Sequence, residues 1–194
     1  MTEAELIAGI KERQRPAFQI LVDRYRDQVI KTAFYFLGDM ADAEDLSQEI
    51  FIEIIQSIYD FRQTSTLKTW IYRITVNKAL NMVKQRKRRG IFFRIGSLFH
   101  GDNPLNTQDY AEPVIQTDAV EKQETRTMIQ KAIDKLPENQ RIAFVLSRFD
   151  DQPYKEIAGI MNISLPAVES LIFRARQNLQ KQLVRSFPEY KSNL

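Results

Sequence analysis

The first part of the chain carries apolar residues at helical spacing, without the sustained alternation that β-strands show. A short helix is predicted over residues 2–10, because Thr2 and Glu5 have the spacing of a capping box. A longer helix is predicted from Pro16, which suits a first helical turn, to Gly38, which suits a helix end. The pattern therefore predicts an all-α fold.

A third predicted helix begins after Asp39, whose carboxylate can cap it. Its buried stripe is expected to consist of Ala43, Leu46, Ile50, Ile54 and Ile58. Residues 59–66 contain the polar run QTST, which is typical of a loop, and Phe61, an aromatic side chain that we expect to project from it.

The helix predicted from Leu67 has two unlike faces when its residues are placed about 100° apart. The apolar face consists of Tyr72, Val76, Ala79, Leu80 and Val83. The other face carries Trp70, Arg73, Asn77, Asn81 and Lys84, and it runs into a basic tail that includes Arg86 and Arg88. An aromatic ring, amides and cations on one face are typical of a surface that binds unpaired bases and their backbone.

A plainer interpretation of this helix stays open. The cations can simply solvate a helix end, since a basic run alone is often no more than that. Tyr72 heads the apolar stripe, so we expect it in the core. Trp70 lies among Leu67, Ile71 and Ile74, and the sequence leaves it open between a core position and a DNA-facing one.

The composition changes at Gly90, where glycine and proline become frequent and helical periodicity is lost. We interpret residues 93–118 as a flexible linker, because more than about 15 structureless residues are uncommon inside one compact domain. Two small helical domains are therefore predicted, over residues 1–92 and 119–186, followed by a tail at 187–194.

The second domain contains a predicted helix-turn-helix. A helix over residues 154–161 leads into a corner at Asn162, which tolerates the left-handed conformation, and a long helix starts at Leu165. The residues expected to pack inward are Ile157, Ala158, Met161, Ile163, Val168, Leu171, Ile172 and Ala175.

The second helix of this motif carries candidate contacts to duplex DNA. They are Pro166, Ala167, Glu169, Ser170, Phe173, Arg174 and Arg176. Arginine suits phosphate or guanine, serine bonds to either, and glutamate accepts from the cytosine amino group. The alternative is a helical hairpin with a solvated face, because such corners are common in all-helical proteins.

An acidic edge is predicted on the third helix, formed by Asp42, Asp45 and Glu49 with Gln48 beside them. Paired carboxylates can hold a divalent metal or act as acid and base. Carboxylates in the first turns of a helix also have a simpler role opposite the helix dipole. We favour a docking edge for a basic partner, because surface charges select partners and speed association.

Composition narrows the function further. The chain has no cysteine and one histidine, His100, so disulfides and thiolate metal sites are excluded and Ser-His nucleophiles nearly so. We expect no catalytic residue, no cofactor and no metal. The net charge is only +3, but the cations are clustered. Without a signal peptide or a long apolar run, a cytoplasmic location is expected.

The motifs together resemble the extracytoplasmic-function (ECF) sigma factors of bacterial RNA polymerase. They are, in order, DAEDLSQEIF, FRQTSTLKTWIYRITVN, the basic tail, LPENQR and YKEIA followed by VESLIFRAR. The similarity spans Phe18 to Leu183 apart from the linker. It implies sigma region 2 and sigma region 4 with no region 3 between them.

The resemblance also implies partners and roles. It assigns Asp45, Gln48 and Glu49 to the beta-prime clamp helices of core RNA polymerase, and region 4 to the beta flap. It assigns Phe61, Trp70, Tyr72 and Asn77 to melting and reading the minus-ten element of promoter DNA. The helix-turn-helix is assigned to the minus-thirty-five element. Such proteins are usually held by an anti-sigma factor, often membrane-anchored, and no direct membrane insertion is expected of this chain.

Two departures limit what the resemblance carries over. Many family members have threonine, a basic residue and arginine where this chain has Ala167, Glu169 and Leu171, so the minus-thirty-five preference is not transferred. The loop QTST also lacks the small Gly-Asp-type residues often found there, which leaves the minus-ten preference open. The alternative functions are a stand-alone helix-turn-helix regulator and a nucleic-acid enzyme that uses the carboxylates.

Overall fold

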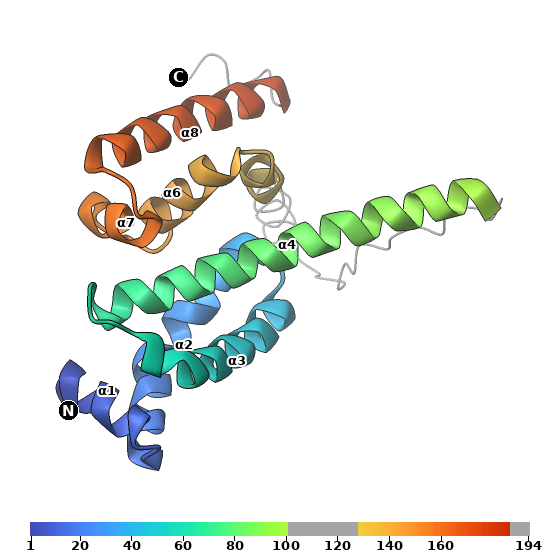
Figure 1. Ribbon diagram of the computed structural model, residues 1–194. Helices are drawn as coiled ribbons and strands as arrows, with labels where there is room; N and C mark the ends of the chain where they lie inside the picture. The colour runs from blue at the N-terminus through green and yellow to red at the C-terminus, as the bar shows by residue number, and fades with distance from the viewer. Residues whose placement is uncertain (101–127, 187–194) are drawn as a thin grey trace, which may run out of the picture.

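The computed structural model describes residues 1–100 and 128–186, with side chains at 1–88 and 128–184. Within those ranges the ordered elements are helices, and no strand is found. The predicted all-α fold is therefore confirmed. Figure 1 shows the helices in two groups, with the long α4 crossing between them.

The N-terminal group consists of α1 (Glu3–Lys11), α2 (Arg15–Leu37), α3 (Met40–Ser57), the 3₁₀ turn η1 (Ile58–Asp60) and α4 (Leu67–His100). The predicted caps are present. Thr2 and Glu5 form a reciprocal capping box, Asp39 accepts from the amide of Asp42 at 2.9 Å, and Gly38 ends α2 with φ of 75°. Local chemistry therefore sets where these helices begin and end.

Helix α4 continues to His100, past residue 92, where we predicted that the first domain would end and a linker would begin. A glycine inside a helix costs only about 1 kcal/mol relative to alanine, so Gly90 and Gly96 are not sufficient to stop it. The remaining linker, residues 101–118, and the start of the next predicted helix, residues 119–127, lie outside the described residues.

The C-terminal group begins with helical residues 128–134. It continues with α6 (Glu138–Arg148), α7 (Tyr154–Met161) and α8 (Leu165–Ser186). The predicted corner between α7 and α8 is confirmed, since Asn162 has φ of 54° in the left-handed region. Ile157, Val168, Ile172 and Ala175 are buried, as the helical pattern predicted.

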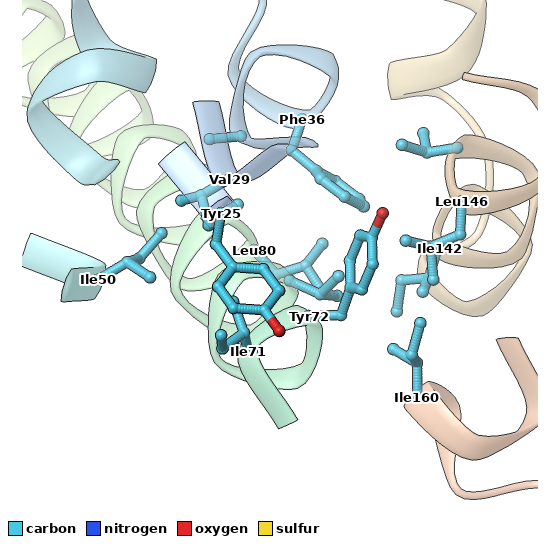
Figure 2. Packing of buried hydrophobic residues seen from close by; sticks show 14 of the residues in the cluster. Tyr25, Val29, Phe36, Ile50, Ile71, Tyr72, Leu80, Ile142, Leu146 and Ile160 are labelled. Atoms are coloured by element: carbon cyan, nitrogen blue, oxygen red, sulfur yellow. The ribbon is translucent and has the colours of Figure 1, made fainter. Parts of the chain in front are cut away.

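The two groups of helices share one hydrophobic cluster. Phe36 of α2 and Tyr72 of α4 are almost fully buried, and they face Ile142 and Leu146 of α6 and Ile160 of α7 (Figure 2). The described parts of the two groups therefore pack against each other along α4.

Candidate nucleic-acid and partner interfaces

The polar face of α4 lies against the C-terminal group. The Nε atom of Arg73 donates to the carbonyl oxygens of Gly159 at 3.2 Å and Ile160 at 3.3 Å, and a second guanidinium nitrogen also donates to Gly159. These carbonyls belong to the last turn of α7, where backbone acceptors lack partners within the helix. Arg73 therefore caps a helix of the other group, and its charge opposes the negative end of the helix dipole.

Asn77 lies one turn further along α4 and is exposed. It lines a cleft of about 460 Å³ between α4 and the C-terminal group, together with Arg73, Val76, Leu80, Glu138, Asn139, Ile142, Ile160, Met161 and Asn162. Both of the predicted base-reading polar residues of α4 thus meet in one interdomain cleft.

The expected projection of Phe61 is wrong for this conformation. Its side chain is 5% exposed, and its ring centroid lies 5.0 Å from that of Trp70 with the planes tilted by 35°. An aromatic pair of this kind contributes about 0.5–1.5 kcal/mol beyond its buried area, which favours the inward position. Trp70 itself is half-buried, so it has one side on Phe61 and the core and another accessible.

Tyr72 is a core residue, as its place on the apolar stripe predicted. It is 2% exposed, and its hydroxyl accepts a 2.7 Å hydrogen bond from Nε2 of Gln152. Burial raises the pKa of the Tyr72 phenol well above its ordinary value, with a further contribution from the nearby Asp150 carboxylate. Tyr72 is therefore a neutral interdomain contact here rather than a surface residue.

The basic end of α4 is partly paired. Lys84 forms a 2.8 Å ion pair with Glu138 at the start of α6, Arg86 pairs with Asp42 of α3, and Arg88 is exposed. Exposed pairs of this kind contribute roughly 0–1 kcal/mol, so phosphates can displace them readily.

The predicted acidic edge is present on α3. Asp45, Gln48 and Glu49 are exposed, whereas Asp42 is partly covered. Ile52, at 55% exposure, lies on the same helix, and sequence reasoning missed it because it falls outside the apolar stripe. Among the side chains the structure describes, no three acidic or histidine groups are arranged to hold a metal ion.

Helix α8 presents its polar face to solvent. Pro166, Glu169, Ser170, Phe173, Arg174 and Arg176 are exposed, and Ala167 is half-buried. Phe173 is 62% exposed, which is high for so large an apolar ring. The exposed face therefore combines an aromatic ring with cations, a hydroxyl and a carboxylate.

A set of buried polar residues joins the two groups, and sequence reasoning missed it. Oγ1 of Thr32 donates to Oδ2 of Asp150 at 2.7 Å, and Gln152 bonds to Tyr72. Arg141, 4% exposed, donates to the carbonyl oxygen of Phe36. Burial raises the pKa of Asp150 to about 6. The run DDQP had the composition of a surface turn, so nothing in the sequence indicated this burial.

Among the helices that the structure describes, none alone is long and apolar enough to cross a membrane. The pair Tyr154–Met161 and Leu165–Val184, bent by 101°, reaches that length and apolar composition only when its two helices are taken together.

Two family matches cover most of the described chain. Residues 21–89 match the family described as sigma-70 region 2, and residues 126–179 match the family described as sigma-70, region 4. The first match ends within α4, and the second begins just before the helical residues 128–134. Each match therefore falls on one of the two groups of helices.

Relatives of known name match over nearly the whole chain. The ECF RNA polymerase sigma factor SigW of Bacillus subtilis (strain 168) is 32% identical, covering 91% of this chain and 94% of that protein. The ECF RNA polymerase sigma-E factor of Escherichia coli (strain K12) is 30% identical, covering 94% and 95%. The RNA polymerase sigma-H factor of Pseudomonas aeruginosa is 30% identical, covering 93% of both chains.

Solved structures show the same fold. CnrH in complex with the cytosolic domain of CnrY has a TM-score of 0.66 at 21% identity, covering 93% of this chain and 96% of that chain. The sigma factor RpoE in complex with the anti-sigma factor NepR from Bartonella quintana has a TM-score of 0.55 at 22% identity, covering 86% and 96%.

Proposed function

The chain belongs to the ECF sigma factors of the sigma-70 family, which are promoter-specificity factors for transcription initiation rather than enzymes, and we propose that α8 reads minus-thirty-five DNA while α4 reads and melts the minus-ten element. The single observation that carries this proposal is the exposed polar face of α8, with Arg174 and Arg176 beside Ser170 and Glu169.

The chemistry of α8 suits a major groove. Arginine donates two hydrogen bonds to guanine, glutamate accepts from cytosine, and phosphate contacts set the register of the helix. Phe173 offers an apolar ring for a thymine methyl group. Ala167 and Glu169 differ from the residues that many family members have at these positions. The minus-thirty-five sequence that this chain prefers is therefore expected to differ from theirs.

The chemistry of α4 suits a separated strand. Unstacking bases costs a few kcal/mol, which stacking and hydrogen bonds to the flipped strand must offset. Asn77 supplies an amide for a base edge, Trp70 and Phe61 supply aromatic surfaces, and Lys84, Arg86 and Arg88 hold the adjacent backbone. Phe61 takes a base only after its contact with Trp70 opens.

The partners follow from the same surfaces. The acidic edge of α3, with Asp45, Gln48, Glu49 and the exposed Ile52, provides charge and apolar area for the beta-prime clamp helices of core polymerase, and the C-terminal group is assigned to the beta flap. An anti-sigma factor is a further partner, since solved relatives of the same fold are bound to CnrY and to the anti-sigma factor NepR.

A footprinting experiment separates this proposal from a stand-alone helix-turn-helix regulator. A sigma factor protects promoter DNA upstream and at the start site only when core polymerase is present. A stand-alone regulator binds duplex DNA by itself, usually as a symmetric dimer on a palindrome. Protection of a palindrome by the isolated chain would therefore contradict the proposal.

A further inference from the structure

We propose that helix α1 holds in place the loop that leads into α4, and that Glu3 of α1 is a positioning residue for recognition of the minus-ten element. The loop consists of residues 62–66 and is named the minus-ten loop. The two ends of α1 contact the two sides of this loop, through Glu3 after it and through Lys11 before it. The inference rests on the proposed function of α4.

On the C-terminal side of the minus-ten loop, Glu3 binds the first turn of α4. Its Oε1 atom accepts from the amide of Leu67 at 2.9 Å. Thr66 caps the same turn locally, since its Oγ1 atom accepts from the amide of Thr69 at 3.1 Å. Amides in a first turn have no partner within the helix, and a carboxylate there also interacts favourably with the helix dipole. The start of α4 therefore has two caps, one local and one from α1.

On the N-terminal side of the minus-ten loop, Tyr59 of η1 binds the other end of α1. Its hydroxyl donates to the carbonyl oxygen of Lys11, the last residue of α1. Helix α1 also packs along η1, on the side of the first group that carries the chain into α4 (Figure 1). Tyr59 is 59% exposed, so the hydroxyl contact rather than burial accounts for where its ring lies.

Helix α1 is itself fixed to the core. Leu6 and Ile10 are 0% and 1% exposed. The crossing with α2 is close, because a Cβ atom at Gly9 would lie only 2.8 Å from the Cβ atom of Ala17. Loss of the Glu3 side chain therefore removes a contact to α4 without releasing α1 from the core.

A second neighbour places the Glu3 carboxylate against the first group of helices. Tyr25 of α2 is 6% exposed. Burial raises the pKa of its phenol, and the Glu3 carboxylate contributes in the same direction, whereas Arg24 lowers it. The carboxylate is therefore close to α2 as well as to the amide of Leu67, although Glu3 is exposed on its outer side.

The minus-ten loop has a conformation that needs such support. Gln63 has φ of 55°, in the left-handed region that side chains other than glycine adopt at a cost. A strained residue of this kind persists when its surroundings hold it. The side chains of Arg62, Gln63 and Thr64 are exposed. A loop held at its ends presents these polar side chains to a separated strand in one geometry, which lowers the entropy lost on binding.

Binding of single-stranded oligonucleotides by core polymerase with the full-length chain tests this inference. The oligonucleotides carry the minus-ten sequence found by mapping RNA starts, and the same sequence with each base changed in turn. Glu3→Ala should reduce the preference for the unchanged sequence about two- to fivefold, the size of effect that a carboxylate has at a helix N-terminus. Association with core polymerase should be unchanged, because the acidic edge on α3 is unaltered.

Three variants separate positioning from a general loss of structure. Glu3→Gln keeps an acceptor oxygen for the amide of Leu67 and should retain most of the preference. Tyr59→Phe removes only the hydroxyl that binds the other end of α1, and it should act in the same direction as Glu3→Ala. Glu12→Ala is the matched control, because this exposed carboxylate at the end of α1 binds Gln14 rather than α4. It should leave the preference unchanged.

The inference is overturned if Glu3→Ala or Tyr59→Phe keeps the full preference, if Glu3→Gln loses as much as Glu3→Ala, or if Glu12→Ala loses as much as either. If Glu3→Ala also loses association with core polymerase, the substitution unfolds the first group, and Tyr59→Phe then decides. Failure of the proposed function looks different, because the unaltered chain itself then shows no preference among the oligonucleotides.

Discussion

Thr32 of α2 donates a 2.7 Å hydrogen bond to the carboxylate of Asp150, a residue separated from it by most of the chain. Both side chains are buried, with Thr32 at 0% and Asp150 at 8% exposure. Burial opposes the charged form of Asp150 and raises its pKa to about 6, although the hydrogen bond from Thr32 favours the charged form. The contact between the two groups of helices is therefore linked to protonation.

The contact between the two groups of helices should strengthen as pH falls from about 6 to about 4. When the groups are in contact, Asp150 has a raised pKa, so it binds the proton more tightly than it does when the groups are apart and its pKa is near the ordinary 3.8. The contact consequently gains stability on acidification and loses it as pH rises, by at most about 3 kcal/mol at 1.36 kcal/mol per pKa unit. The distance between labels on the two groups, measured against pH, tests this.

The control for the pH experiment is Asp150→Asn, which should remove the dependence in this window. The charged groups near Asp150 are Lys31 and Lys68, which lower its pKa, and Asp151, which raises it. If the pH dependence survives Asp150→Asn, a titratable group other than Asp150 causes it.

Arg174→Ala should weaken binding to the minus-thirty-five element by roughly 1–3 kcal/mol if the guanidinium contacts a base pair bidentately. Binding of the holoenzyme to an upstream-element duplex measures it. Arg148→Ala, in α6, is a matched loss of charge away from the recognition helix. Equal binding by Arg174→Ala and the unaltered chain would favour a plain helical hairpin with a solvated face.

Asn77→Ala should change which sequences are opened at the minus-ten element. Asn77 is exposed and carries the only side-chain amide that we assign to base reading on α4. We expect redistribution of start sites rather than a uniform loss, since phosphate contacts are unaffected. Asn178→Ala, an amide on α8 outside the assigned contacts, serves as the comparison. An unchanged start-site profile would remove the base-reading role.

Charge reversal on the acidic edge should reduce association with core polymerase. Asp45→Lys and Glu49→Lys replace exposed carboxylates, so folding of the helices should be preserved, as circular dichroism can verify. The loss should be larger at low salt, where surface charges are less screened. Asp23→Lys, at an exposed position on α2, is the matched control. If Asp45→Lys and Glu49→Lys associate with core polymerase as well as Asp23→Lys does, the docking edge is refuted.

Local chemistry explains what the sequence predicted well. Gly38 and Asn162 end helices because the left-handed conformation suits them, and Asp39 caps α3 through its own carboxylate. Tyr72 was placed in the core by its helical phase alone. Each of these features depends on residues within a few positions, which is why a single sequence is enough to predict them.

Contacts between distant segments explain what the sequence missed. Phe61 turns inward because Trp70 is there to receive it. Asp150 and Gln152 are buried because α2 and α4 lie over them, and no pattern within DDQP encodes that partner. The sequence does not predict the continuation of α4 past Gly90, because glycine disfavours a helix and the apolar periodicity is lost there.

If this chain gives core RNA polymerase its choice of promoter, a map of RNA 5′ ends should show it. Genomic DNA is transcribed by core polymerase with the chain, without it, and with Arg174→Ala. We expect starts that appear only with the chain, share sequence elements near minus ten and minus thirty-five, and weaken with Arg174→Ala. The same starts in the absence of the chain would contradict it.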